Sequence, residues 1–384
     1  MADNKDKKVL NVPALRFPEF TEEWEKCKFG EIATGFDYGM NAAAKPYDGQ
    51  NKYIRITDID ETSSTYNNED VVSPDGTLSE NYMVNERDIL LARTGASTGK
   101  SYLYRKSDGK LYFAGFLIRA NVAEHNPYFV FSQLHTHRYW RWVSIMSARS
   151  GQPGINSQEY ASFPIFTTTL IEENKISTLL SLIDERIATQ NKIIEKLETL
   201  IKGIRHNVFQ QLRKDVGFNS TIGDILSFEQ PQRYIVSSTE YSDDSSCTPV
   251  LTANKAFILG YTTETDGIYS KGDCIIIDDF TLDCKYVSFP FKIKSSAIKI
   301  LTAENKYILR FIYEYLKSLD ISTEEHKRHY ITEIQPSSCI LPDDKTLTTI
   351  ALMFESITNK LENEQSLALM LNKQKQYLLS KMFI

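Results

Sequence analysis

The chain has 384 residues, of which 41% are hydrophobic and 24% charged, and its formal net charge is −6. This length suffices for two or three domains that each bury a core, and the composition is ordinary for a soluble globular protein. The negative charge argues against indiscriminate binding of nucleic acid. No stretch approaches the roughly 18 consecutive apolar residues of a membrane span, and the start lacks the apolar core of a signal peptide. We therefore expect a cytoplasmic protein without a membrane partner.

Cysteine and histidine usage gives no metal site. The odd number of cysteines, with no C-x-x-C among them, predicts reduced thiols rather than a disulfide framework or a zinc site. His135 and His137 form an H-x-H pattern, but the surrounding sequence is typical of a helix, on which positions two apart do not face each other.

The predicted elements divide the chain into an N-terminal segment (1–20), a first globule (21–168), a long helix (169–214), a second globule (215–343) and a C-terminal helix (344–384). In the first globule, DILLARTG, LYFAGFLIRANV and similar stretches run apolar between Gly, Asn and Asp, which predicts short strands joined by turns. The stretch NPYFVFSQLHTHRYWRWVSIM predicts one helix with Asn126 as its N-cap and Pro127 in its first turn.

The segment GASTGKS in this globule contains the residue types of a Walker A loop, namely Gly95, Gly99, Lys100 and Ser101. Three residues separate its two glycines where the phosphate-binding loop needs four, and strand-like SYLYR follows where a helix should begin. The sequence therefore predicts a turn between two strands and no nucleotide site.

Catalytic motifs are incomplete elsewhere as well. The tetrapeptide NPYF at Asn126 falls one proline short of the motif by which adenine methyltransferases grip their target amine, and no glycine-rich loop is present to hold the methyl donor. Carboxylates are plentiful, but none has a spacing that indicates acid–base chemistry. A stand-alone enzyme is therefore the least favoured class.

The helix over 169–214 carries a narrow apolar seam. Its seam positions, at alternating steps of four and three, are Ile176, Leu180, Ile183, Ile187, Gln190, Ile194, Leu197, Ile201, Ile204 and Val208. At about 1.5 Å per residue the segment would span roughly 50 Å. A seam this narrow predicts one partner helix.

The C-terminal helix supplies that partner, because it carries the same seam 174 positions later, at Ile350, Phe354, Ile357, Leu361, Glu364, Ala368, Leu371, Lys375, Leu378 and Met382. We expect the two helices to pair as an antiparallel coiled coil, held by Ile187, Ile194, Leu197, Ile201, Leu361 and Leu371. Gln190 and Glu364 occupy matched polar positions, which suggests a device that fixes register. The simpler alternative is two long amphipathic helices that do not pair.

The two globules are also similar to each other in sequence. KFGEIATGF resembles STIGDILSF, and NERDILLARTGASTGKSYLYR aligns without a gap with SKGDCIIIDDFTLDCKYVSFP, which matches Lys100 with Lys285. These matches indicate a tandem duplication of an α+β unit.

Two similar globules on a helical spacer suit two short DNA half-sites about one helical turn apart, or ~34 Å. Locally basic runs over 93–119, 138–149 and 285–299 could contact phosphates. The alternative from another class is a non-catalytic scaffold whose globules bind proteins and no DNA.

The order of the motifs along the chain is similar to that of a known protein family. PALRFPEF, DILLARTGASTGK, SGQPGIN followed by SFPIF, and the helix ending IKGIRHNVFQQL resemble the specificity subunit of type I restriction–modification systems. The resemblance runs from Val12 to the C-terminus. It implies two tandem α/β target recognition domains, each recognising one half of a bipartite DNA sequence, separated by the two paired helices.

The resemblance also implies partners. The long helices would dock two methyltransferase subunits, and two ATP-driven restriction subunits would join outside. S-adenosylmethionine, ATP and magnesium would then belong to those partners, and the chain itself would be a non-catalytic subunit without a cofactor.

Carried over residue by residue, the resemblance gives candidate DNA-binding residues. They are Arg93, Thr94, Ser97, Lys100, Arg149, Gln152 and Asn156 in the first domain and Lys255, Lys285, Arg328, His329 and Tyr330 in the second. The second domain departs from the pattern, since it has KRHYITEI in place of GQPGIN and an acidic turn, DDFTLD. We therefore expect the two half-sites to differ.

Overall fold

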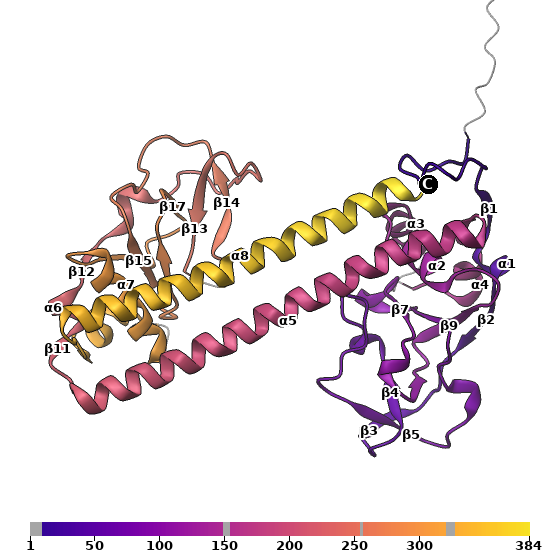
Figure 1. The fold of residues 1–384 in the computed structure, drawn as a ribbon, viewed down its shortest axis with the longest axis horizontal. Coiled ribbons are helices and arrows are strands. Elements are labelled where there is room, and N and C mark those ends of the chain that lie inside the picture. Colours follow the sequence, from indigo (N-terminus) through magenta and orange to yellow (C-terminus); the bar gives the residue numbers. More distant parts are fainter. Residues whose placement is uncertain (1–9, 149–153, 254–255, 320–326) are drawn as a thin grey trace, which may run out of the picture. The chain divides into compact units, whose positions relative to one another are not determined.

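The computed structural model describes residues 10–148, 154–253, 256–319 and 327–384 (Figure 1). Contacts divide the chain into two compact units, one of Met1–Thr189 with Ala368–Ile384 and one of Gln190–Leu367. The long helices α5 (Leu170–Asp215) and α8 (Asp344–Met382) each contribute to both units. Among the described residues, none of the helices combines the length and apolarity needed to cross a bilayer.

The first unit is built on an antiparallel sheet of order β2-β9-β6-β7. Its strands are β1 (Glu25–Lys28), β2 (Ala33–Tyr38), β3 (Ala43–Pro46), β4 (Lys52–Ile54), β5 (Val72–Asp75), β6 (Asp88–Ala92), β7 (Ser101–Leu103), β8 (Leu111–Phe113), β9 (Leu117–Val122) and β10 (Pro164–Thr167). Its short helices are α1 (Phe29–Ile32), α2 (Pro127–Gln133), α3 (His137–Ser147) and α4 (Ser157–Ala161). Three strand pairs, β1-β10, β3-β5 and β4-β8, complete the unit.

Both faces of this sheet are covered, because alternate residues of a strand point to opposite sides. Ile89 and Leu91 of β6 pack in one core with Val130 of α2 and Val143 of α3. Leu90 lies in a second core, with residues of β4 and β8. This explains why Ile89–Ala92 form an unbroken apolar run that is buried throughout.

The single helix predicted from Asn126 onward is wrong, because the structure has α2 and α3 with a break between them. Asn126 is the N-cap of α2, as expected. At the break the Thr136 hydroxyl donates to the Gln133 carbonyl oxygen at 2.8 Å and accepts from the Tyr139 N–H. Such local side-chain bonds compete with the helical ladder and start a new helix.

The second unit has a sheet of order β12-β18-β15-β16 and a smaller one of order β14-β13-β17. Its strands are β11 (Ser220–Thr221), β12 (Ser227–Glu229), β13 (Thr248–Leu251), β14 (Ile258–Thr262), β15 (Cys274–Asp278), β16 (Cys284–Val287), β17 (Lys292–Ile293), β18 (Ile298–Thr302) and β19 (Ser338–Cys339). Its short helices are α6 (Ile222–Ile225) and α7 (Lys306–Ser318), and a single π-helical turn covers Tyr330–Ile334. Leu309 and Ile312 of α7 pack against Ile275 of β15, while Ile276 faces a separate core.

The two units share an internal plan. The orders β2-β9-β6-β7 and β12-β18-β15-β16 correspond strand for strand, and each unit begins with a strand that pairs with its last one, β1 with β10 and β11 with β19. A Cβ on Gly30 would lie 3.0 Å from the Cβ of Ala161, and one on Gly223 would lie 2.7 Å from the Cγ of Gln335. In each unit, therefore, a glycine lets the first short helix contact the segment before the last strand closely.

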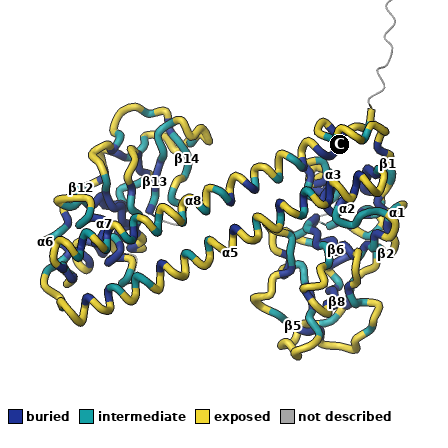
Figure 2. Tube along the Cα trace, viewed as in Figure 1, coloured by how far each residue is buried: buried dark blue, intermediate teal, exposed yellow. Residues whose placement is uncertain are grey.

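Both long helices carry their buried residues at seam spacing, between exposed positions (Figure 2). In the first unit Ile176 and Leu180 of α5 share a core with Leu379 and Met382 of α8. In the second unit Phe209 and Leu212 of α5 share a core with Leu347 and Phe354 of α8.

The residues predicted to hold the helices together differ in burial. Ile201 and Leu371 are buried, whereas Ile187, Ile194, Leu197 and Leu361 are half-buried. In the second unit the Gln190 amide donates to the Glu364 backbone carbonyl at 3.1 Å and also bonds its carboxylate. The central helix predicted over 169–214 is observed one residue later, over Leu170–Asp215.

Candidate nucleic-acid interface

The turn between β6 and β7 of the first unit holds four of the seven DNA-binding residues predicted in the first domain. Main-chain hydrogen bonds fix it: the Arg93 N–H donates to the Phe116 carbonyl at 3.0 Å, and the Arg93 carbonyl accepts from the Ile155 N–H at 2.9 Å. Thr94 forms a bridge with Gly154. The turn is thereby held between the β8–β9 turn and the segment before α4.

This turn is not a phosphate-binding loop. Ser101, which follows Lys100, begins β7, and β7 pairs antiparallel with β6, as the sequence predicts. Gly99 has a φ of +92°, and a Cβ there would lie 2.8 Å from the Cγ1 of Val143. A glycine is required here because the turn packs against α3.

Arg93 presents its guanidinium beside exposed aromatic rings. The guanidinium carbon lies 4.7 Å from the centroid of the Tyr38 ring, and the Tyr38 hydroxyl accepts from the Ser157 N–H at 3.3 Å. Hydrogen bonding to Ser157 lowers the pKa of Tyr38. Tyr38 and Phe116 are 41% and 58% exposed. Aromatic rings of this kind, with a guanidinium over them, form surfaces on which planar groups such as bases can stack.

A pocket of about 570 Å³ opens at this place, lined among others by Tyr38, Met40, Tyr53, Arg55, Arg93 and Phe116. Two nearby cations are held by carboxylates: Arg55 bonds Asp58 at 2.7 Å, and Lys100 bonds Glu61 at 2.6 Å. Arg93 forms no ion pair with any residue that the structure describes. Among the described residues that line this pocket, Arg93 is the cation that contacts an aromatic ring and no carboxylate.

The other residues predicted in the first domain fall into three groups. Thr94 and Ser97 are half-buried in the turn, and Asn156 is exposed and caps α4 by accepting from the Glu159 N–H. Lys100 is half-buried, and its ammonium is paired with the exposed carboxylate of Glu61. Arg149 and Gln152 lie outside the described residues.

The corresponding turn of the second unit, between β15 and β16, carries a carboxylate where the first carries a guanidinium. The Asp279 N–H donates to the Ala297 carbonyl at 2.7 Å, and the Asp279 carbonyl accepts from the His329 N–H at 2.9 Å. The Asp279 side chain is buried, accepts from the Tyr330 N–H at 2.9 Å, and lies 3.5 Å from the buried ammonium of Lys299. The Nε of Arg328 lies 3.9 Å from the same carboxylate, and the Arg328 side chain is 55% exposed.

The remaining residues predicted in the second domain differ in exposure. His329 and Tyr330 are buried, and the Tyr330 ring packs on Phe228 at 5.6 Å. This burial argues against direct DNA contact by either side chain. Lys285 is half-buried on β16, and Lys255 lies outside the described residues.

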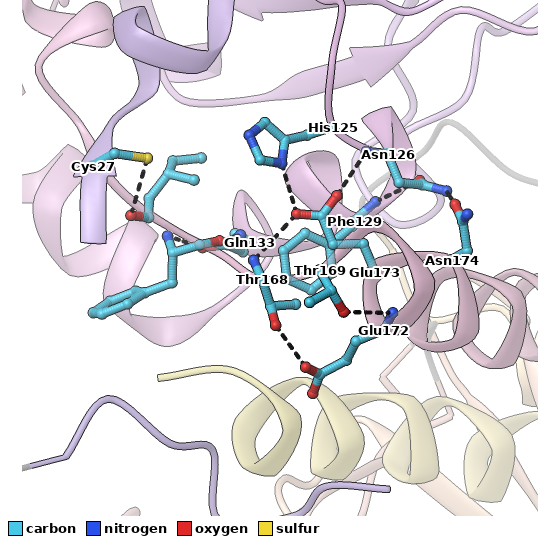
Figure 3. A network of polar contacts seen from close by, with 12 residues as sticks. Cys27, His125, Asn126, Phe129, Gln133, Thr168, Thr169, Glu172, Glu173 and Asn174 are labelled. Carbon is cyan, nitrogen blue, oxygen red and sulfur yellow. Dashed lines mark hydrogen bonds and ion pairs between the residues drawn. The ribbon is translucent and has the colours of Figure 1, made fainter. Parts of the chain in front are cut away.

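The sequence did not predict a polar network at the start of α5 (Figure 3). Glu173 accepts from the Asn126 N–H and bonds the His125 Nδ1, each at 2.8 Å. Glu172 bonds the Arg16 guanidinium through both oxygens and accepts from the Trp24 indole at 3.3 Å. Hydrogen bonding to Glu173 raises the pKa of His125. In the sequence the two acids resemble ordinary first-turn carboxylates, which favour any helix N-terminus.

Comparisons with known proteins agree with this fold. The EcoR124I/EcoR124II specificity subunit of a type I restriction enzyme from Escherichia coli is 41% identical over 143 residues, which make up 35% of this chain and 35% of that relative. The match thus spans about a third of the curated relative. A type I restriction–modification S subunit from M. genitalium superposes with a TM-score of 0.69 at 16% identity, covering 97% of this chain and 99% of that one. No protein-family model matches the chain. The resemblance inferred from the motifs is confirmed: the chain is similar to type I specificity subunits in sequence over part of its length and in fold over nearly all of it.

Proposed function

We propose that the chain is the DNA sequence-specificity subunit of a type I restriction–modification complex. Each unit contributes one α/β target recognition domain, and each domain recognises one half of a bipartite DNA sequence. The observation that carries the proposal is the repeated plan: two sheets of the same strand order each have a turn whose first residue makes corresponding main-chain hydrogen bonds. The 41% identity to a specificity subunit over 143 residues supports DNA recognition as the role of such a domain.

We propose further that α5 and α8 separate the two domains as an antiparallel coiled coil. Support comes from each unit on its own. The shared cores in the first unit join early residues of α5 to late residues of α8, and those in the second join late residues of α5 to early residues of α8. The Gln190–Glu364 hydrogen bond supports the role of these two residues in setting register.

Docking of two methyltransferase and two restriction subunits belongs to the same proposal, as does a cytoplasmic location. Both long helices expose large apolar side chains off the seam, including Leu182 at 57%, Leu200 at 52%, Leu369 at 58% and Met370 at 59%. Exposed apolar side chains on a helix are suited to cover by protein partners. S-adenosylmethionine, ATP and magnesium would be bound by those partners, and the chain would contribute specificity but no catalysis.

The test is to map methylated adenines across the host genome with and without the gene for this chain. We expect a bipartite motif that disappears on deletion. A genome with no such motif, together with partner binding that ignores DNA, would favour a protein-binding scaffold instead.

A further inference from the structure

The β6–β7 turn (93–100) and the β15–β16 turn (279–283) differ in length, but the first residue of each makes corresponding main-chain hydrogen bonds. In the first, the turn residue Arg93 donates to the carbonyl of Phe116 and accepts from Ile155; in the second, Asp279 donates to Ala297 and accepts from His329. Both turn residues directly follow the central strands of sheets with the same order, β6 and β15. Arg93 and Asp279 therefore occupy one position of a common framework. The gapless sequence match is wrong here, because it pairs Arg93 with Asp278 and Lys100 with Lys285, whereas the strand registers pair Arg93 with Asp279 and Lys100 with Asp283.

The two residues differ in charge, yet both units place a guanidinium at this position. In the first unit it belongs to the turn, as Arg93 over the Tyr38 ring. In the second it comes from the facing segment, because Arg328 directly precedes His329 and its Nε lies 3.9 Å from the Asp279 carboxylate. Its chain position matches that of Gly154, which directly precedes Ile155 in the first unit.

Each guanidinium contacts a group that orients it, with Arg93 half-buried and Arg328 exposed. Tyr38 supplies a ring face, and its own hydroxyl is held by Ser157. Asp279 supplies a buried carboxylate that already lies 3.5 Å from the Lys299 ammonium and accepts from the Tyr330 N–H, so Arg328 does not neutralise it alone. With 55% of its side chain exposed, Arg328 keeps donors available to a ligand.

We propose that Arg93 and Arg328 are the equivalent base-recognising residues of the two domains. Arg93 is the first residue of its turn, whereas Arg328 lies in the segment that hydrogen-bonds to the first residue of the other turn. This inference rests on the function proposed above. A guanidinium donates two parallel hydrogen bonds to the O6 and N7 of guanine in the major groove. Each half-site therefore contains a guanine, or the cytosine paired with it, that depends on one of these two arginines. Asp279 is a positioning residue for Arg328.

The experiment isolates the complex from host cells through a tag on this chain and offers it a pool of random duplex DNA. The wild-type complex should select a bipartite motif. Arg93→Lys should relax one G·C position in one half only, and Arg328→Lys should relax one position in the other half only. Since a bidentate arginine–guanine pair discriminates by about 5- to 150-fold, selectivity at the affected position should fall by that factor.

Lysine keeps the charge for phosphate contact but loses the planar fork, so overall affinity should fall much less than selectivity. Arg186→Gln and Arg233→Gln, which change an exposed arginine in each unit outside the basic runs, should leave the motif intact. Thermal melting of every variant checks that it folds. Lysine is used at both positions because it retains the positive charge.

Three outcomes would overturn the inference: an unchanged motif in both lysine variants, relaxation of the same half by both, or uniform weakening with no position relaxed. A wild-type complex that selects no bipartite motif would instead refute the function on which the inference rests. The two failures are therefore distinguishable.

Discussion

Charged residues that lie close together in this chain can differ widely in burial. Asp279 and Lys299 form a buried pair, with 2% and 1% of their side chains exposed. A buried charge that loses its partner is strongly destabilising. The pair therefore stabilises the second unit while Arg328, on the same carboxylate, stays exposed.

Replacing Asp279 with alanine should therefore lower the stability of the second unit. The change leaves Lys299 buried without its carboxylate and removes the acceptor of the Tyr330 N–H, and we expect a loss of about 3–5 kcal/mol. Chemical denaturation measures this free energy. Asp283→Ala, which removes an exposed acid of the same turn, is the control. Equal stability of the two variants would contradict the assignment.

The His125–Glu173 pair predicts a pH dependence. Because the pKa of folded His125 is raised above the unfolded value of about 6.5, its stabilisation is complete below that value and is lost as pH rises through the folded pKa. The wild type should exceed His125→Gln in melting temperature at pH 6, and the difference should shrink by pH 9. His137→Gln, at an exposed histidine, should show no such trend. A constant difference across this range would exclude the titration.

Among the elements, the long helices were the most predictable part of the fold. Their seams repeat over many turns, so α5 was placed within a residue of its observed ends. The break before α3 was missed, because it depends on Thr136 hydrogen bonds that compete locally with an otherwise helical pattern.

Site residues were harder to predict, because they are brought together by contacts between segments far apart in the sequence. Tyr38 and Phe116 meet Arg93 only through the folding of β2 and β9 onto β6, and nothing in their local sequence marks that meeting. The basic sequence around Arg328 has no hydrophobic periodicity, so it does not indicate that the His329 and Tyr330 side chains are buried.

The apolar seam of α5 predicts that a charge destabilises the fold at a seam position but not at its exposed neighbour. Ile194→Asp places a charge at a half-buried seam position, whereas Ile193→Asp places the same charge at its 38%-exposed neighbour. We expect only the seam variant to lower stability, by about 1 kcal/mol or more, which corresponds to roughly 2–4 °C in Tm for a unit of this size. Differential scanning fluorimetry compares the two. Equal melting temperatures would show that Ile194 has no helix partner.

For the whole molecule, the net charge of −6 means that any affinity for DNA must come from local cations. Phosphate contacts and base contacts then have different signatures. A lost phosphate contact weakens all sequences alike, while a lost base contact changes which sequences are preferred.

Lys285, half-buried on β16, is predicted to contact a phosphate. Lys285→Gln in the assembled complex should reduce the slope of log affinity against log salt by about 1 and should leave the preferred sequence unchanged. Titrations of one duplex at several salt concentrations give the slope. A changed motif with an unchanged slope would reassign Lys285 to base recognition.

The hydrogen bonds that hold the two recognition turns have an evolutionary consequence. They use the N–H and C=O groups of Arg93 and Asp279 and none of their side-chain atoms. Every residue except proline offers the same two groups, so the Arg93 side chain can change without loss of these bonds, whereas the buried Asp279 side chain is also held by Lys299 and the Tyr330 N–H. Target preference can then diversify by substitution at a few surface positions while the scaffold is inherited intact, and a guanidinium lost from one side of the contact can be regained from the other.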